Sequence, residues 1–242
     1  MKPFKTKFKR IETKFILSQA QLNQLQPILD LYMEPNEFAH STIANLYYDT
    51  EDYRMIRQSL EKPKYKEKIR VRSYSALPNN DSQVFAEIKK KFQKVVYKRR
   101  LGAPLDETMA FFNGQSEAID TSQVKEELVY LQRQYQRLKP KMYIYYDRYS
   151  LQGKEDKDMR ITFDRNITYR DYDLDLTYGP YGEQLLPEGY CLMEVKIEGA
   201  YPLWLIQELT RLKVYQSSFS KYGCAYQAVK QQGGNQYGQF VS

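Results

Sequence analysis

Charged and apolar side chains alternate along several segments of this chain. Successive side chains on a β-strand point to opposite faces, so this alternation predicts strands with one charged and one apolar face. In the segment 67–74, for example, Lys68, Arg70 and Arg72 share one face, opposite the apolar residues between them. The strands predicted in this way are Phe8–Leu17, Ile43–Asp49, Glu67–Tyr74, Gln83–Phe92, Val95–Leu101, Lys141–Leu151, Met159–Ile167 and Tyr190–Glu198.

Helices are predicted between and after these strands. Ser18 and Gln21 have the spacing of a capping box and predict a helix over Gln19–Tyr32. Pro202 suits the first turn of another helix. The remaining predicted helices are a short one capped by Thr50 and ending at Leu60, then Glu107–Asn113, Ser122–Leu138, Pro202–Val214 and Lys221–Lys230. Antiparallel strands with helices packed outside them indicate an α+β fold.

Composition excludes several classes of protein. The single histidine, His40, excludes a multi-histidine zinc site and makes a catalytic dyad or triad with histidine a poor explanation. Two cysteines are too few for a disulfide framework, and we expect reduced thiols in a cytoplasmic protein. No apolar run approaches the roughly 20 residues of a membrane helix. The net charge of +7 suggests an anionic partner.

The charged strand faces are mostly cationic, with isolated glutamates among the lysines and arginines. An antiparallel sheet often leaves a polar face in water, which explains any one of these strands. A jointly cationic face is better explained by a closed antiparallel barrel whose lumen binds a polyanion and whose apolar outer face is covered by helices. Arginine forks and lysine charges suit phosphate oxygens, and the glutamates suit Mg²⁺ or Mn²⁺.

Seven short motifs follow one another along the chain: Glu12-Thr-Lys14, Lys68-Ile-Arg70-Val-Arg72, Glu87-Ile-Lys89, Tyr146-Asp-Arg148, Arg160-Ile-Thr-Phe-Asp164, Glu194-Val-Lys196 and Phe219-Ser220-Lys221-Tyr222. In this order they resemble the polyphosphate polymerase domain of vacuolar transporter chaperone (VTC) proteins. That domain belongs to the triphosphate tunnel metalloenzymes, also called CYTH-like. Each motif is weak alone, but together they cover nearly the whole chain.

The resemblance implies a role for each matching residue. The phosphate-handling catalytic residues are Lys14, Arg70, Arg72, Lys89, Arg148, Arg160, Lys196 and Lys221. Further phosphate contacts come from Tyr146 and Ser220, with Lys98 and Arg100 nearer a tunnel mouth. Glu194 is the principal ligand of the divalent metal, Mn²⁺ or Mg²⁺, and Glu87 and Glu12 assist it.

The function that the resemblance implies is a stand-alone, VTC-type polyphosphate polymerase, an enzyme that transfers the γ-phosphate of ATP to a growing polyphosphate chain. The same residues would also suit a metal-dependent hydrolase of inorganic triphosphate or nucleoside triphosphates, or a polyphosphate-binding module without turnover. Nucleic acid is the least favoured partner, because few aromatic residues lie in line with the basic ones.

We expect a single tunnel domain over residues 1–230 and a disordered tail, rich in Gly and Gln, over 231–242. The expected ligands are ATP or triphosphate and polyphosphate. The eukaryotic polymerase has membrane helices and a phosphate-sensing domain, and neither is expected in this chain. The sequence leaves open the oligomeric state, the primer and the existence of a membrane partner.

Overall fold

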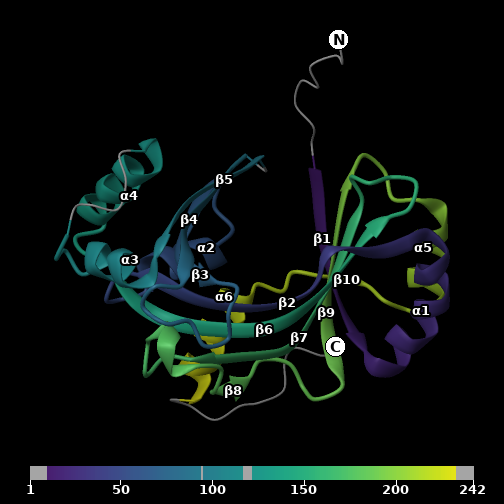
Figure 1. The fold of residues 1–242 in the computed structure, drawn as a ribbon. Helices are drawn as coiled ribbons and strands as arrows, with labels where there is room; N and C mark the ends of the chain where they lie inside the picture. Colours follow the sequence, from purple (N-terminus) through teal and green to yellow (C-terminus); the bar gives the residue numbers. More distant parts are fainter. Residues whose placement is uncertain (1–9, 94, 117–121, 233–242) are drawn as a thin grey trace. The chain divides into compact units, whose positions relative to one another are not determined.

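A computed structural model describes residues 10–93, 95–116 and 122–232 (Figure 1). The chain divides into two compact units, each assembled from separate stretches of sequence. Unit 1 takes its described residues from 1–41, 146–167 and 186–219, and unit 2 takes its described residues from 42–145, 168–185 and 220–242. Whether the chain forms one domain over 1–230 stays a prediction.

The predicted strands and helices are all present, with some changed ends. The strands are β1 Arg10–Ser18, β2 Met33–Asp49, β3 Tyr65–Ser73, β4 Gln83–Phe92, β5 Val95–Pro104, β6 Lys139–Gly153, β7 Arg160–Arg170, β8 Glu183–Gln184, β9 Tyr190–Glu198 and β10 Gln216–Ser217. The helices are α1 Gln19–Tyr32, α2 Arg54–Leu60, α3 Leu105–Phe112, α4 Gln123–Gln134, α5 Leu203–Arg211 and α6 Lys221–Gln232, with a short 3₁₀ helix, η1, over Leu176–Tyr178.

The differences at the ends have local causes. Helix α4 ends four residues before the predicted Leu138, because Gln136 and Arg137 adopt positive φ angles of 50° and 80°. The strand β2 begins ten residues before the predicted Ile43, in a stretch whose Pro and Asn residues argued against a strand. Gln231 and Gln232 are the last residues of α6, and residues 233–242 of the predicted tail lie outside the described residues.

The ten strands form one sheet in the order β10-β1-β9-β7-β6-β2-β3-β4-β5, with β8 paired to β7. The pairings described are antiparallel, so the α+β class with an antiparallel sheet is confirmed. Strands β10 and β5 are the two edges, and no hydrogen bonds between them close the described strands into a barrel. The hydrogen bonds of the described strands therefore do not show the predicted closed barrel.

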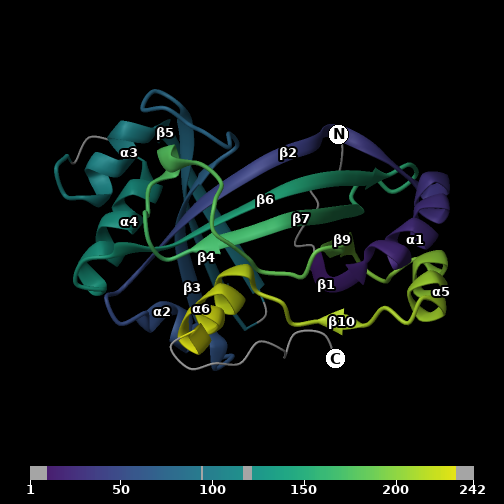
Figure 2. The same cartoon turned by 90° about the horizontal axis from the view of Figure 1, so that it is seen from below.

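Unit 1 buries the apolar face of its strands under α1 and α5 (Figures 1 and 2). Leu22, Leu25 and Leu29 of α1 join Leu205 and Leu209 of α5 in this core. The predicted capping box is present: Gln21 N donates to Ser18 Oγ at 3.2 Å, and Ser18 N donates to Gln21 Oε1 at 2.9 Å. Burial of this face leaves the charged face of β1, β7 and β9 opposite the helices.

Unit 2 has its own core on the apolar face of β2, β3, β4 and β5. Buried residues of these strands pack against side chains of α3, α4 and β6, including Phe112, Leu128 and Tyr143. The N-cap residue of α2 is Tyr53, whose side chain makes no capping bond, so the predicted cap at Thr50 is wrong. Thr50 Oγ1 instead accepts a hydrogen bond from Arg54 N at 2.8 Å from outside the helix. No helix in the described part of the chain is long and apolar enough to cross a membrane.

Candidate functional site

In unit 1 the predicted site residues gather around one carboxylate. We call this group, which lies on β1, β6, β7 and β9, the Glu194 cluster; its members are Glu12, Lys14, Tyr146, Arg148, Arg160, Thr162, Asp164, Glu194 and Lys196. Across β1, β9 and β7, the strand register aligns Glu12 with Lys196 and Arg160 in one row, and Lys14 with Glu194 and Thr162 in the next. Their side chains therefore share the face opposite the core.

Three cations surround the Glu194 carboxylate at moderate distances. Its oxygens lie 3.3 Å from Lys196 Nζ, 3.7 Å from Lys14 Nζ and 3.8 Å from Arg148 Nη2. These distances are longer than the 2.7–2.9 Å typical of charge-assisted hydrogen bonds. The three ion pairs are therefore loose, and a bound ligand would rearrange them at small cost. The Glu194 side chain is only 9% exposed, which strengthens its electrostatic field.

Arg148 is held by a different carboxylate. Its Nε and Nη2 donate to the two oxygens of Asp164 at 2.6 and 2.8 Å, and its guanidinium carbon lies 5.2 Å from the centre of the Tyr146 ring. Burial alone would lower the pKa of Arg148, but Tyr146, Asp164 and Glu194 raise it overall. Arg148 is therefore a permanent cation with a fixed orientation on the charged face.

The oxygen donors of the Glu194 cluster suit a hard divalent cation. The buried hydroxyl of Thr162, directly across from Glu194, has no hydrogen-bond partner in the structure. Carboxylate and hydroxyl oxygens are acceptable ligands for Mg²⁺ or Mn²⁺, and Mg²⁺ usually combines one or two carboxylates with water and substrate phosphates. Among the residues described, no three Asp, Glu, His or Cys side chains form a metal centre. The metal that fits here is therefore one that takes only one or two ligands from the protein and the others from water and phosphate.

Unit 2 carries a more strongly cationic group on β3, β4 and β5, which we call the Glu87 cluster. Its members are Lys68, Arg70, Arg72, Glu87, Lys89, Lys98 and Arg100. The register aligns Lys68, Lys89 and Lys98 in one row and Arg70, Glu87 and Arg100 in the next. Six cations on three adjacent strands thus share a face with a single carboxylate.

Glu87 is almost completely buried and is tightly paired with cations. Arg70 Nη2 lies 2.6 Å from one oxygen and Lys98 Nζ lies 2.6 Å from the other, and Arg72 Nε is 3.8 Å away. Burial alone would raise the pKa of Glu87, but Arg70, Arg72 and Lys98 lower it to about 2. Because both of its oxygens already lie in close ion pairs with cations, the geometry favours charge balance for Glu87 over a ligand role.

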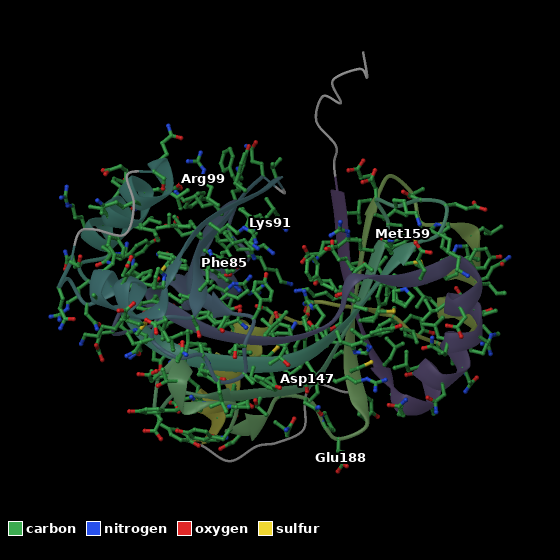
Figure 3. The ribbon with its side chains drawn as sticks, in the orientation of Figure 1. Phe85, Lys91, Arg99, Asp147, Met159 and Glu188 are labelled. Atoms are coloured by element: carbon green, nitrogen blue, oxygen red, sulfur yellow. The ribbon has the colours of Figure 1, made fainter. Side chains whose placement is uncertain are left out.

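Polar side chains orient the arginines of this cluster. Arg70 Nη1 donates to Tyr47 Oη at 2.9 Å, and Arg72 Nε donates to Asn45 Oδ1 at 3.0 Å. The guanidinium of Arg100 lies 4.9 Å from the Phe85 ring, which Figure 3 labels on this layer. These contacts restrict the rotamers of the three arginines and reduce the entropy lost when an anion binds.

Ser220 and Lys221 are also in unit 2, at the start of α6. Ser220 Oγ accepts from Lys68 Nζ at 2.9 Å and from Gly223 N at 3.3 Å. This hydrogen bond connects the predicted serine to the Glu87 cluster, while Lys221 is the first residue of α6. The roles of all these residues toward phosphate or metal stay predictions.

The predicted site residues are thus described in two groups, one in each unit, and their assignment to one site stays a prediction. Sequence reasoning did not assign Asp164, Thr162, Tyr47 or Asn45 to the site, although Asp164 and Thr162 lie in the motif that begins at Arg160. Asp164 could have been found from the sequence, because it is an acidic residue at alternating spacing from Arg160 on a predicted strand. Asn45 and Tyr47 carry no charge, so only their tertiary contacts reveal them.

Solved structures share this fold. A candidate adenylate cyclase from Bacillus halodurans aligns with a TM-score of 0.53 at 15% identity, covering 87% of this chain and 93% of that one. A candidate adenylyl cyclase from Hippeastrum, described as having a dominant triphosphatase activity, aligns with a TM-score of 0.53 at 13% identity, covering 90% and 96%. At such identities the likeness concerns the fold alone. No curated protein matches the chain.

The family model of the VTC domain matches residues 9–230. This range contains all seven motifs and both clusters, and it confirms the resemblance that the motifs indicated. The chain belongs to the VTC domain family.

Proposed function

We propose that this chain is a VTC-type polyphosphate polymerase that transfers the γ-phosphoryl group of ATP to the end of a polyphosphate chain. The observation that carries the proposal is the Glu87 cluster, in which six cations on three strands share a face with one carboxylate. Such an excess of positive charge is self-repulsive and is relieved by a bound polyanion. Membership of the VTC domain family makes polyphosphate the favoured polyanion.

The arginines and lysines of the Glu87 cluster would bind phosphate oxygens. Arg70 and Arg72 present planar forks that bind two oxygens at once, whereas Lys68, Lys89 and Lys98 act as point charges. Their fixed positions would stabilise the charge that develops on the transferred phosphoryl group and on the leaving diphosphate. Ser220 and Lys221 add donors at the start of α6.

The Glu194 cluster would supply the metal site. Glu194 is the proposed principal ligand, with Glu12 and the unpaired hydroxyl of Thr162 as neighbouring oxygen donors. A divalent ion bound there supplies charge neutralisation for phosphate oxygens. Lys14, Lys196 and Arg148, with Arg160 and Tyr146, would bind further phosphate oxygens. Glu87, first predicted as a third metal ligand, is better proposed as the balancing charge among the cations of unit 2.

In the proposed reaction a terminal oxygen of polyphosphate attacks the γ-phosphorus of ATP. A new P–O bond forms to that oxygen, the bond from the γ-phosphorus to the β–γ bridging oxygen breaks, and ADP leaves with the electron pair. A terminal phosphate is already a good nucleophile, so the chain needs no strong general base.

The proposal also includes a closed tunnel barrel and a cytoplasmic location. The two free, buried thiols of Cys191 and Cys224 are consistent with a reducing compartment.

The alternative is a metal-dependent hydrolase of inorganic triphosphate or nucleoside triphosphates. The triphosphatase activity described for the Hippeastrum protein of the same fold favours it. In that reaction water replaces the polyphosphate end, and a partly exposed carboxylate such as Glu12 would orient it. A binding module without turnover is the third possibility, and the carboxylates of the Glu194 cluster argue against it.

The deciding experiment incubates the purified protein with ATP and Mn²⁺ and separates the products on a gel stained for polyphosphate, with free phosphate assayed in parallel. The variant Glu194→Ala tests the site, and Glu34→Ala, which removes a surface carboxylate of unit 1, is the matched control. A ladder of chains that is lost only in Glu194→Ala supports the polymerase. Free phosphate without chains supports the hydrolase, and polyphosphate binding without either product supports the binding module.

A further inference from the structure

The ends of β3, β4 and β5 that meet near the β4–β5 connection expose apolar side chains. Tyr65, Phe92 and Val95 are directly paired across the three strands and therefore share one face, and Tyr97 lies on the same face two residues further along β5. Their exposed fractions are 45%, 47%, 52% and 56%. Val96, on the opposite face, is 46% exposed. We call these five residues the hairpin patch.

Contiguous exposed apolar residues on a soluble domain indicate a surface that contacts something less polar than water. The patch lies on a rigid platform, because all three strands are paired along their length and Gln93 N donates to Lys64 O at 3.0 Å. The Tyr65 hydroxyl donates to Glu67 at 2.7 Å, which fixes the ring. Binding through this patch would therefore require little ordering of the chain.

The patch is surrounded by positive charge. Seven of the twelve residues from 89 to 100 are Lys or Arg and none is acidic, and 62–66 adds three lysines. The nearest acids are already engaged: Glu67 accepts from tyrosines, and Glu127 pairs with Lys90 and Arg99. Within the described residues Lys64 and Lys91 have no acidic partner; Figure 3 shows Lys91 and Arg99 on opposite sides of this layer.

We propose that the hairpin patch docks on an anionic lipid bilayer, with its apolar side chains in the headgroup region and the flanking lysines against lipid phosphates. Apolar burial and electrostatic attraction together are the requirements for binding at a membrane surface. Nucleic acid fits less well, because the two valines, one on each face of β5, offer no ring on which a base could stack. The proposal does not depend on the polymerase reaction.

Co-sedimentation with vesicles tests the proposal. The full chain is mixed with vesicles of phosphatidylcholine alone or with phosphatidylglycerol added, and tripolyphosphate is present so that the Glu87 and Glu194 clusters are occupied. We expect binding only to the anionic vesicles, weakening as salt is raised. The double variant Phe92→Ser with Val95→Ser should weaken binding at least about tenfold, and Lys64→Glu with Lys91→Glu by a similar factor.

Two controls address unrelated effects. Leu31→Ser removes an apolar side chain that is 65% exposed on α1 of unit 1, and it should bind vesicles like the unmodified chain. Thermal unfolding of each variant checks that the fold is intact, which is expected because every substituted residue is solvent-accessible. Absent binding to anionic vesicles, or binding that the hairpin variants leave unchanged, would overturn the proposal. Binding of a single-stranded oligonucleotide that requires Phe92, without vesicle binding, would overturn it in favour of nucleic acid.

Discussion

Arg148 and Asp164 are joined on the neighbouring strands β6 and β7 by two hydrogen bonds of 2.6 and 2.8 Å. Asp164 is fully buried, and Arg148 Nη2, which donates to Asp164, also lies 3.8 Å from a Glu194 oxygen. The carboxylate of Asp164 thus determines where the guanidinium stands relative to Glu194. Asp164 is best described as a positioning residue for the Glu194 cluster.

The first prediction concerns Asp164→Asn. The change keeps the shape of the side chain but leaves Arg148 paired with a neutral amide in a buried place, so the free energy of unfolding should fall by about 2–4 kcal/mol. Urea unfolding followed by circular dichroism measures the loss. The matched control is Glu34→Gln, which removes the charge from a surface ion pair of the same unit and should change stability by less than about 1 kcal/mol. Equal losses in the two variants would show that the buried pair has no special role.

A second prediction concerns acid stability through Glu87. Its pKa is lowered from 4.5 to about 2 in the folded chain. A carboxyl group with a lowered pKa binds its proton more readily in the unfolded chain, so its contribution is complete above about pH 4.5 and is lost as the pH falls to about 2. That contribution is on the order of 3 kcal/mol. In Glu87→Gln the decline in stability over this interval should be correspondingly smaller.

Urea unfolding at several pH values between 2 and 6 in the unmodified chain and in Glu87→Gln measures this difference, with the pH limits set by the same lowered pKa. Glu51→Gln is the control, because Glu51 is an exposed partner of Lys139. The prediction is wrong if the curves of the unmodified chain and Glu87→Gln run parallel across this interval.

The third prediction compares two buried threonines. Thr162 Oγ1 has no hydrogen-bond partner among the described residues, so Thr162→Val should leave the free energy of unfolding unchanged or raise it by up to about 1 kcal/mol. Thr108 Oγ1 donates to Pro104 O at 2.8 Å, so Thr108→Val should lower it by about 1 kcal/mol. Denaturant unfolding without added metal measures both. A clear loss in Thr162→Val would mean that its hydroxyl has a partner in solution.

A fourth prediction concerns Arg170, which is fully buried in unit 2. Its guanidinium donates to the carbonyls of Asp173, Asp175, Gly179 and Tyr181 and lies between the rings of Tyr143 and Tyr181, 3.6 and 4.1 Å from their centres. Lysine cannot reproduce this fork, so Arg170→Lys should lower the free energy of unfolding by about 3 kcal/mol.

The Arg170→Lys variant should also open the segment 171–182 to proteases, because four of its carbonyls lose their donor. Limited proteolysis with mapping of the cut sites measures this effect. Arg99→Lys is the control, since Arg99 is half exposed and pairs only with Glu127. Protection of 171–182 in both variants would contradict the role given to Arg170.

Local pattern was sufficient for the elements and their faces. Alternation identified the strands of the charged face, and Ser18 with Gln21 predicted the start of α1, because strand pleat and helix capping depend on residues close in sequence. The same local signals failed at β8 and β10, which are two residues long and exist only because a neighbouring strand pairs with them.

The sequence by itself therefore determined the α+β class, the strands longer than two residues, the charged face and, through its ordered motifs, the family. Tertiary structure alone decided which charges meet within each unit. In unit 1, Arg148 is held more tightly by Asp164 than by Glu194, and in unit 2, Glu87 is ion-paired with Arg70 and Lys98. The physical reason is that an ion pair depends on side-chain distance and burial, which strand register and packing set between residues far apart in the chain.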